Sequence, residues 1–497
     1  MSDLLAGAGV LVAAGTAAAT ILLPPGRLRA AAMLAALVLF PVLILGDQWD
    51  SRQIADLRDD TARLISLVYL AVIGALLLAA IFDRWPFAMP LAIVAALPFR
   101  VPLESGGDTA NLLVPLYLVI AGAAIATAVK DWRGWSADPL TPAGVGRWLP
   151  RVLAAVVILY ALQALYSPDF SKSLQNVCFF FVPFALVYAL LRDVRWDREL
   201  LVWALGVVAV EAVVFVAIGS VEWATRSLLW NDLVIRSNEF HTYFRVNSVF
   251  WDPNIYGRYL ALVAVLAMAA LLWTWDRRTF GLLTALVAVL WIGLAPTFSQ
   301  SSFAALLGGL AVLAALKWSW RWTLAAVSLG AAMGILVVLL VGGSDEISLD
   351  RINIDTSGRA NLASGGLRLF ADRPVYGYGS GSFPKAYREH VKSRKVPVSV
   401  SHTEPITVAA EQGLIGFAAY IALIVLALWT MARGLAWNGS PPTGASGQVA
   451  RAAVLAAFAA LLVHTMAYAG FYEDPITWVL LAAGASLAAA PVVRDST

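Results

Sequence analysis

Apolar runs of about 18 residues or more are the feature that most constrains this chain, because such a run crosses a bilayer as a helix. Segments within them, such as residues 336–343 and 421–429, lack the alternation of apolar and polar residues that a membrane β-barrel needs. The chain is 60% hydrophobic and 13% charged, whereas a soluble domain is about half apolar and a quarter charged. The sequence therefore predicts an all-α polytopic membrane protein.

The boundaries of these runs predict about 14 or 15 transmembrane helices, depending on whether the short fourth run spans. The expected helices cover residues 4–24, 29–46, 64–82, 87–99, 110–130, 149–166, 174–191, 200–219, 255–273, 279–297, 300–316, 322–342, 404–431, 449–469 and 475–490. The order of the runs predicts four regions, which are additional N-terminal membrane helices (1–84), a membrane core (85–342), a large loop (343–403) and C-terminal membrane helices (404–497).

Basic residues in the short connections predict the orientation of the chain. Those expected on one face are Arg27, Arg29, Arg84, Lys130, Arg133, Arg147, Arg192, Arg195, Arg198, Arg277, Arg278, Lys317, Arg321, Arg433, Arg451 and Arg494. We therefore expect this face to be cytoplasmic in a multi-pass plasma (inner) membrane protein, although the opposite loops also hold many Lys and Arg. The large loop is then extracytoplasmic and forms part of the working surface.

Charge and cysteine content exclude several classes of function. The net charge is +3, and the basic residues are not gathered into the stripe that nucleic-acid binding requires. The single cysteine, Cys178, excludes an internal disulfide and a Cys-rich metal site. We expect no cofactor, no metal and no nucleic-acid partner.

Two ionisable residues lie inside predicted membrane helices, where a charge costs several kcal/mol. Glu211 is near the middle of its helix, and His464 is toward the outer end of another. Each is a candidate functional residue. The alternative is that each forms a hydrogen bond with a neighbouring helix.

The outer connections contain residues suited to binding an anion. Arg245 precedes Asp252-Pro253, which predicts the start of a helix. Backbone N–H groups at a helix start, together with a guanidinium, form an anion site. The alternative is an ordinary helix cap beside a solvated arginine.

The large loop is basic, which suits a phosphorylated lipid or an anionic glycan, unless these residues are simply solvated. Its basic residues are Arg359, Arg368, Arg373, Lys385, Arg388, Lys392, Arg394 and Lys395. The glycine run at 377–381 follows no predicted strand, so we expect a turn and not a nucleotide-binding loop. His402 ends the loop just before a helix, where an imidazole can take a proton from a hydroxyl near neutral pH.

Four of these segments together resemble the bacterial O-antigen ligases and related O-antigen polymerases. His402-Thr403 is followed by Gly413-Leu414-Ile415-Gly416, as in the family's His motif and following helix. The segment at 374–383, PVYGYGSGSF, is similar to the family's P-x-x-G-x-G-x-x-x-F turn. Arg245 with Asp252-Pro253-Asn254, and Arg359 at the start of a loop helix, resemble its two arginine segments.

The chain departs from the family pattern in two places. Thr403 stands where the family usually has Asn, Ser or Gln, and Gln300 stands where it often has Arg. Another cation must then replace the missing arginine. Arg359 is the first candidate, followed by Arg258 and Arg368.

The resemblance, which covers roughly residues 85–490, implies an inverting, metal-independent membrane glycosyltransferase. It would move a glycan from an undecaprenyl-diphosphate-linked donor to an acceptor hydroxyl on the outer face of the membrane. His402 would be the general base, and Arg245, Arg359, Arg258 and Arg368 would bind the diphosphate. Glu411 is expected to be structural or to contact glycan.

Two other functions remain open from the sequence. A transporter or flippase of lipid-linked sugars also needs a basic cavity, and Glu211 is its best support, although no inverted repeat is visible. A glycosyltransferase with a polyprenyl-monophosphate donor would use an acidic pair in the first outer loop, where Asp59-Asp60 lies.

Overall fold

The structure is a computed structural model of the 497-residue chain, and it describes residues 3–49, 51, 55, 58–105, 108–140, 144–240, 243–342, 359–391, 400–435, 437 and 446–489. Lys392, Arg394, Lys395 and Arg494, named above, lie outside the described residues.

Every range predicted to be a membrane helix contains helix, so the fold class is confirmed as an all-α polytopic membrane protein. The helices are α1 (Asp3–Leu22), α2 (Arg27–Asp47), α4 (Thr61–Arg84), α5 (Ala88–Ala96), α6 (Val114–Arg133), α7 (Leu149–Ala164), α8 (Phe170–Asn176), α9 (Val182–Leu191), α10 (Arg198–Thr225), α12 (Pro253–Trp273), α13 (Arg277–Leu294), α14 (Gln300–Lys317), α15 (Trp320–Gly342), α19 (Glu404–Ala432), α20 (Ser446–Thr465) and α21 (Pro475–Ala489). Short 3-10 segments precede α7 (Gly144–Trp148) and follow α13 (Ala295–Thr297), and a π-helical turn (Val177–Phe181) joins α8 to α9.

Twelve helices among the described residues are long and apolar enough to cross a membrane, fewer than the 14 or 15 predicted. The difference includes α5 and α21, which have nine and 15 residues. The predicted outer loop at 100–109 is instead part of a β-hairpin of β1 (Val101–Ser105) and β2 (Asp108–Leu112), whose register pairs Val101 with Leu112. The two glycines between the strands in the sequence are typical of a hairpin connection.

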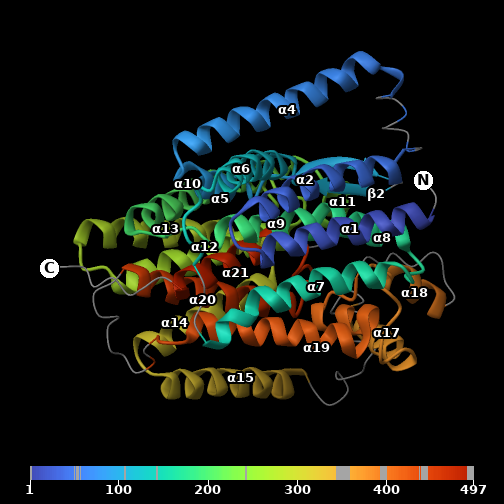
Figure 1. Cartoon of the computed structure of the whole chain (residues 1–497). Helices are drawn as coiled ribbons and strands as arrows, with labels where there is room; N and C mark the ends of the chain where they lie inside the picture. The colour runs from blue at the N-terminus through green and yellow to red at the C-terminus, as the bar shows by residue number, and fades with distance from the viewer. Residues whose placement is uncertain are drawn as a thin grey trace.

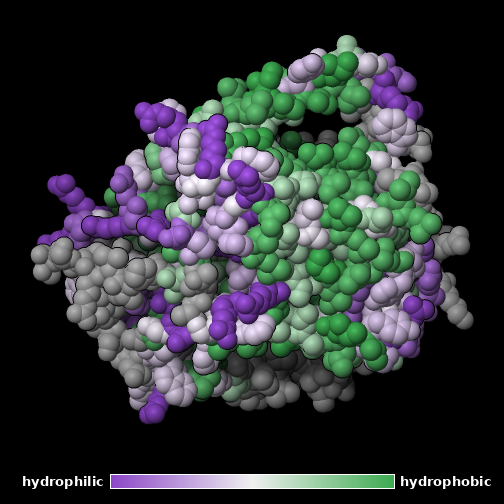
Figure 2. All heavy atoms as spheres, viewed as in Figure 1, coloured by the Kyte–Doolittle hydropathy of each residue, from purple (hydrophilic) through white to green (hydrophobic). Residues whose placement is uncertain are grey.

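The elements that connect the long helices gather at one end of the molecule, called here the loop end. They are β1, β2, α11 (Asp232–Phe240), α17 (Arg359–Asp372) and α18 (Phe383–His390). In Figure 1 these elements lie toward the right, with the N-terminus, and the C-terminus lies at the left. Apolar side chains cover the middle of the face seen in Figure 2, and polar ones gather toward the ends. This arrangement is the one expected of a protein that crosses a bilayer.

Small residues bring the central helices close together. Helix α14 packs against α12 and α20, and α12 also packs against α20. A Cβ at Gly309 of α14 would lie 3.2 Å from the carbonyl oxygen of Ala456, so the glycine permits this approach. Helix α1 packs against α2, α7 and α9, so the N-terminal helices contact the membrane core directly.

A buried ion pair ties α2 to α6 at the end opposite the loop end. Arg29 Nε lies 2.6 Å from Asp131 Oδ2, and Arg29 Nη1 lies 2.9 Å from Asp193 Oδ2. Arg29 and Asp131 are both almost fully buried. Loss of one partner from such a pair costs about 3–5 kcal/mol of folding free energy, because it leaves an uncompensated charge.

The glycine-rich segment at 374–379 docks into a break in α19, where Gly413 has φ 63° and ψ −165°. Leu414 N donates to Pro374 O (2.7 Å), and Gly379 N donates to Glu411 O (2.7 Å). A Cβ at Gly413 would lie 2.5 Å from the Val375 carbonyl, so a side chain has no room there. The segment forms turns, as predicted, and it joins α17 and α18 to α19.

Candidate active site

His402 lies at the loop end in a tight turn that immediately precedes α19. Its φ of 61° is in the left-handed region, which histidine adopts more readily than most residues. The Ser401 hydroxyl stabilises the turn by donating to Thr403 O (2.8 Å) and accepting from Thr403 N (3.2 Å). Neither ring nitrogen of His402 forms a hydrogen bond with a described residue. The imidazole is therefore held by the backbone with both nitrogens available.

The pKa of His402 is lowered from its ordinary value, mainly by burial and then by the positive charge of Arg359, while Asp252 opposes the shift. A lowered pKa keeps the imidazole neutral near pH 7. A neutral imidazole can accept a proton, so the local electrostatics suit a general base.

Arg245 is held against the start of α12 and the end of α13. Its Nε donates to Thr297 O (2.8 Å) and its Nη2 donates to Asn254 Oδ1 (3.1 Å). Asp252 is the N-cap of α12, as predicted, and accepts from Asn254 N at 2.6 Å. Burial lowers the pKa of Arg245, and Asp252 opposes this shift.

A second guanidinium, Arg258, lies one turn further along α12 and is buried. Its Nη2 is 2.7 Å from Asp474 Oδ2, just before α21. Its Nε and Nη1 have no hydrogen-bond partner among the described residues. Arg100, which follows α5, is close enough to interact electrostatically with both Arg258 and Asp474. Two donor groups of Arg258 are therefore free for an anion.

Tyr468 lies at the centre of these groups. Its ring centroid is 6.3 Å from that of His402 and 5.6 Å from that of His464, and the Arg258 guanidinium carbon lies 6.0 Å from it. The pKa of Tyr468 is raised, mainly by burial and then by Asp252, whereas Arg258, Arg100 and Arg359 oppose the shift. The hydroxyl therefore stays protonated at neutral pH.

Arg100, Arg245, Arg258 and Arg359 all interact electrostatically with Tyr468 or with one another, and we call them the arginine cluster. Arg359 also donates from Nη1 to Ala467 O at 3.4 Å. Guanidinium groups bind phosphates and carboxylates through charge-assisted hydrogen bonds, so the arginine cluster around Tyr468 is the candidate anion site.

The other sequence candidates lie in different surroundings, and of these His464 is next to the cluster. Arg368 is exposed on α17 and forms no ion pair with a described residue. Glu211 accepts from Tyr259 OH at 2.7 Å, which is the interhelical hydrogen bond given above as its alternative role. Buried His464 lies beside the cluster, with Nε2 3.2 Å from Ser301 Oγ. Glu411 accepts from Gly381 N and Phe383 N, both at 2.9 Å, so it stabilises the glycine turn.

The position of Gln300 is also informative. Gln300 is exposed at the start of α14, whereas its neighbour Ser299 is buried and donates to Asn254 Oδ1 at 2.9 Å.

Sequence reasoning missed Arg100, Tyr468 and Asp474. A signal for Asp474 was present, because Asp474-Pro475 repeats the Asp252-Pro253 pattern at the start of another helix. Arg100 and Tyr468 carry no such local signal.

An apolar crevice of about 390 Å³ runs from the arginine cluster toward the opposite end of the molecule. Leu97, Tyr259 and Ile476 line it, and they lie within three residues of Arg100, Arg258 and Asp474 respectively. Its far end is lined by Trp196, Arg198 and Trp273.

Within the described residues there is no group of His, Cys, Asp or Glu side chains able to hold a metal ion.

A model of the O-antigen ligase family matches residues 285–421, a region that runs from α13 to α19 and includes Arg359, His402 and Gly413. This match covers about a quarter of the chain and supports the O-antigen ligase resemblance identified from the sequence. No curated protein matches the chain.

Proposed function

We propose that this member of the O-antigen ligase family transfers a glycan from an undecaprenyl-diphosphate-linked donor to an acceptor hydroxyl on the outer face of the plasma membrane. The observation that carries the proposal is that His402, whose ring nitrogens form no hydrogen bond with a described residue, lies near Arg359 of the arginine cluster. An apolar crevice begins close to two other members of this cluster, Arg100 and Arg258. In this proposal the loop end faces away from the cytoplasm, in agreement with the distribution of short-loop basic residues.

His402 acts as the general base. It takes the proton of the acceptor hydroxyl while that oxygen attacks the anomeric carbon of the donor sugar. The bond from that carbon to the diphosphate oxygen breaks, and its electron pair leaves with the diphosphate. Attack opposite the leaving group inverts the anomeric configuration, and no metal takes part in these steps.

The arginine cluster binds the diphosphate and stabilises the charge that grows on it as the bond breaks. Arg258 supports this role because Nε and Nη1 have no hydrogen-bond partner among the described residues, while Nη2 pairs with Asp474. Arg245, in the segment before α12, and Arg359, at the start of α17, also contribute. We assign the charge missing at Gln300 to Arg359 first and to Arg258 second, with Arg100 as a further source; exposed Arg368 ranks after these.

The crevice takes the polyprenyl chain of the donor. A chain anchored by its diphosphate at Arg100 and Arg258 has an apolar path that begins at Leu97 and Ile476. Burial of each methylene in such a path contributes about 0.8 kcal/mol. Because the crevice is apolar and begins beside the arginine cluster, a lipid-linked donor can bind with its polyprenyl chain still in the membrane.

The two rival functions have less support. For a flippase, Glu211 was the best candidate, and it forms a hydrogen bond with Tyr259. For a monophosphate-dependent enzyme, Asp59 and Asp60 are exposed, and Asp60 serves as the N-cap of α4 by accepting from Arg63 N at 3.1 Å.

Transfer in detergent micelles separates these functions, because micelles have no compartment for transport. The purified protein is mixed with lipid-linked glycans extracted from a strain that lacks its gene. We expect a larger glycan product and release of undecaprenyl diphosphate, both followed by mass spectrometry. A protein that leaves every glycan covalently unchanged would favour transport, and release of a monophosphate would favour the other glycosyltransferase.

A further inference from the structure

A buried chain of polar side chains joins Arg245 to His464. Arg245 Nη2 donates to Asn254 Oδ1 (3.1 Å), and Ser299 Oγ donates to the same oxygen (2.9 Å). Ser299 Oγ lies 3.2 Å from Ser301 Oγ, which lies 3.2 Å from His464 Nε2. The two serines, the asparagine and the histidine are all buried. The chain therefore connects the starts of α12 and α14 to the end of α20, and it ends on an arginine of the arginine cluster.

The direction of each hydrogen bond in this chain follows from the groups that it joins. An amide oxygen only accepts, so Ser299 uses its one hydroxyl proton in the bond to Asn254 Oδ1. Ser301 must then donate to Ser299 Oγ, and its own oxygen accepts from His464 Nε2. His464 Nε2 therefore carries a proton, and it is the first donor of the chain.

The last bond of the chain orients the guanidinium of Arg245. Ser299 holds the Asn254 amide with its oxygen toward Arg245, while Arg245 Nε donates to Thr297 O at 2.8 Å. Two fixed contacts define the plane of the guanidinium. Nη1 forms no hydrogen bond with a described residue, so this group remains for an anion.

The two serines of the chain flank Gln300, the position where an arginine is missing. Ser299 is the N-cap of α14 and accepts from Ser302 N at 3.3 Å, and Ser301 lies in the first turn of that helix. Both hydroxyls are buried, whereas Gln300 is exposed. The residues on either side of the missing arginine thus support Arg245.

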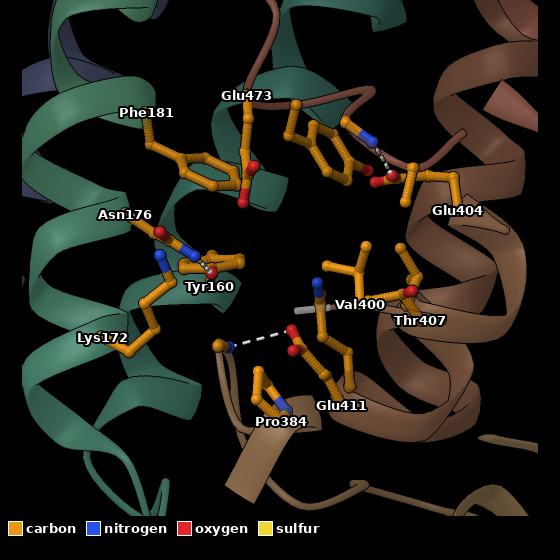
Figure 3. A pocket seen from close by; sticks show the side chains of 16 residues that line it. Tyr160, Lys172, Asn176, Phe181, Pro384, Val400, Glu404, Thr407, Glu411 and Glu473 are labelled. Atoms are coloured by element: carbon orange, nitrogen blue, oxygen red, sulfur yellow. Dashed lines mark hydrogen bonds between the residues drawn. The ribbon is translucent and has the colours of Figure 1, made fainter. Parts of the chain in front are cut away.

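The His464 end of the chain is firmly held. His464 lies in the last turn of α20, and its carbonyl accepts from Tyr468 N at 3.0 Å. Further along, Glu404 Oε2 accepts from Gly470 N (2.7 Å) and Phe471 N (3.1 Å). Figure 3 shows the Glu404 carboxylate at the edge of a small polar cavity, where it holds this backbone. Because the segment after α20 is anchored in this way, the imidazole of His464 is a fixed donor.

We propose that His464 is a positioning residue of the diphosphate site. Through the buried chain it keeps the guanidinium of Arg245 oriented for the donor, and unlike His402 it contacts neither substrate. This inference rests on the proposed function. It adds a role for a membrane histidine that the proposed mechanism does not use.

The direct test measures binding and does not depend on turnover. Undecaprenyl diphosphate is titrated into the full-length protein in micelles, and the bound fraction is measured by native mass spectrometry. His464→Leu removes the first donor and Ser301→Ala interrupts the chain, so each should weaken binding about three- to tenfold. His464→Gln should restore most of the affinity, because its amide N–H groups can donate to Ser301 Oγ.

Two controls accompany these variants. Undecaprenol, which lacks the diphosphate, should bind equally to all of them. Thr465→Val removes a neighbouring buried hydroxyl whose bond to Leu462 O (2.8 Å) stays within α20, and it should leave undecaprenyl diphosphate binding unchanged.

A double-mutant cycle separates positioning from a general loss of structure. In an Arg245→Ala protein there is no guanidinium to orient, so His464→Leu should not weaken binding further. Losses that add in the double variant, or a His464→Leu loss that His464→Gln does not restore, overturn the positioning role. In transfer assays His464→Leu should leave the acceptor KM unchanged.

A ligand-free measurement tests the chain itself. The protein has four histidines, so ¹⁵N NMR of histidine-labelled protein can assign His464 from the signal that His464→Gln lacks. We expect a protonated Nε2, and an unprotonated Nε2 overturns the chain. Equal undecaprenyl diphosphate binding by the wild type and His464→Leu overturns this inference and leaves the donor site intact. Absence of binding by the wild type overturns the donor site of the proposed function, and the positioning role with it.

Discussion

The ring of Tyr468 lies 6.3 Å from the imidazole of His402, and the two residues come from opposite sides of α19 and α20 in the sequence. The same tyrosine ring lies beneath the guanidinium of Arg258. It therefore links the proposed base to the proposed diphosphate site, and its removal should affect both.

Tyr468→Ala should reduce transfer much more than Tyr468→Phe. The phenylalanine keeps the ring that packs against His402 and supports Arg258, and it loses only a hydroxyl whose raised pKa keeps it protonated. A cation–π contact contributes about 0.5–2 kcal/mol, so we expect an effect of about tenfold for the alanine variant. Steady-state transfer rates check this. Equal losses in both variants would assign the role to the hydroxyl.

The rate of transfer should fall as the pH drops through the pKa of His402, because only the neutral imidazole takes a proton. Burial and Arg359 lower this pKa below the ordinary value of 6.5. Full activity should therefore persist at neutral pH, and the loss of activity should begin only below pH 6.5. Arg359→Gln removes a neighbouring positive charge, raises the His402 pKa and should move the acid limb to higher pH. Asp252→Asn removes a negative charge and should move the limb the other way. Acid limbs that coincide in all three proteins would exclude His402 as the titrating group.

Arg245→Lys should keep the charge yet lose much of the rate, and Arg245→Ala should lose more. The guanidinium bonds to Thr297 O and Asn254 Oδ1 at once, and a lysine ammonium cannot reproduce this fork. Gln300→Arg adds a positive charge where Arg245→Ala removes one. It should be tolerated, because Gln300 is exposed. Rates with lipid-linked donor measure each effect. Full activity in both Arg245→Ala and Arg359→Ala would show that the diphosphate binds elsewhere.

Gly413→Ala should destabilise the loop end and reduce transfer. The backbone conformation of Gly413 is open mainly to glycine, at a strain of about 1–3 kcal/mol for other residues, and a Cβ would meet the Val375 carbonyl at 2.5 Å. Gly206→Ala is the control, because nothing lies within 4 Å of its Cβ position in α10. Thermal unfolding in detergent, with transfer measured in parallel, checks the pair. An unchanged midpoint for Gly413→Ala would contradict the docking of residues 374–379 into α19.

The sequence predicted the helices well because long apolar runs have few alternatives in a membrane. It also predicted the cap at Asp252 and the turn at Gly377, since both follow from local chemistry. It failed at β1 and β2, where residues 100–109 were predicted to be an outer loop and the following helix was predicted to begin at residue 110. Arg100 and Tyr468 were missed because each looks like an ordinary residue at the end of a helix. Only the packing of α20 against α12, and of α5 against α10, brings them to the site.

The most direct test of the whole account is transfer by His402→Ala in micelles, compared with His390→Ala, which alters a histidine of α18 that pairs with Asp372. We predict that His402→Ala lowers the transfer rate by about 10²–10⁴-fold with unchanged thermal unfolding and unchanged inhibition by undecaprenyl diphosphate, while His390→Ala retains the wild-type rate. Transfer by His402→Ala at a rate close to that of the wild type would contradict the assignment of His402 as the general base.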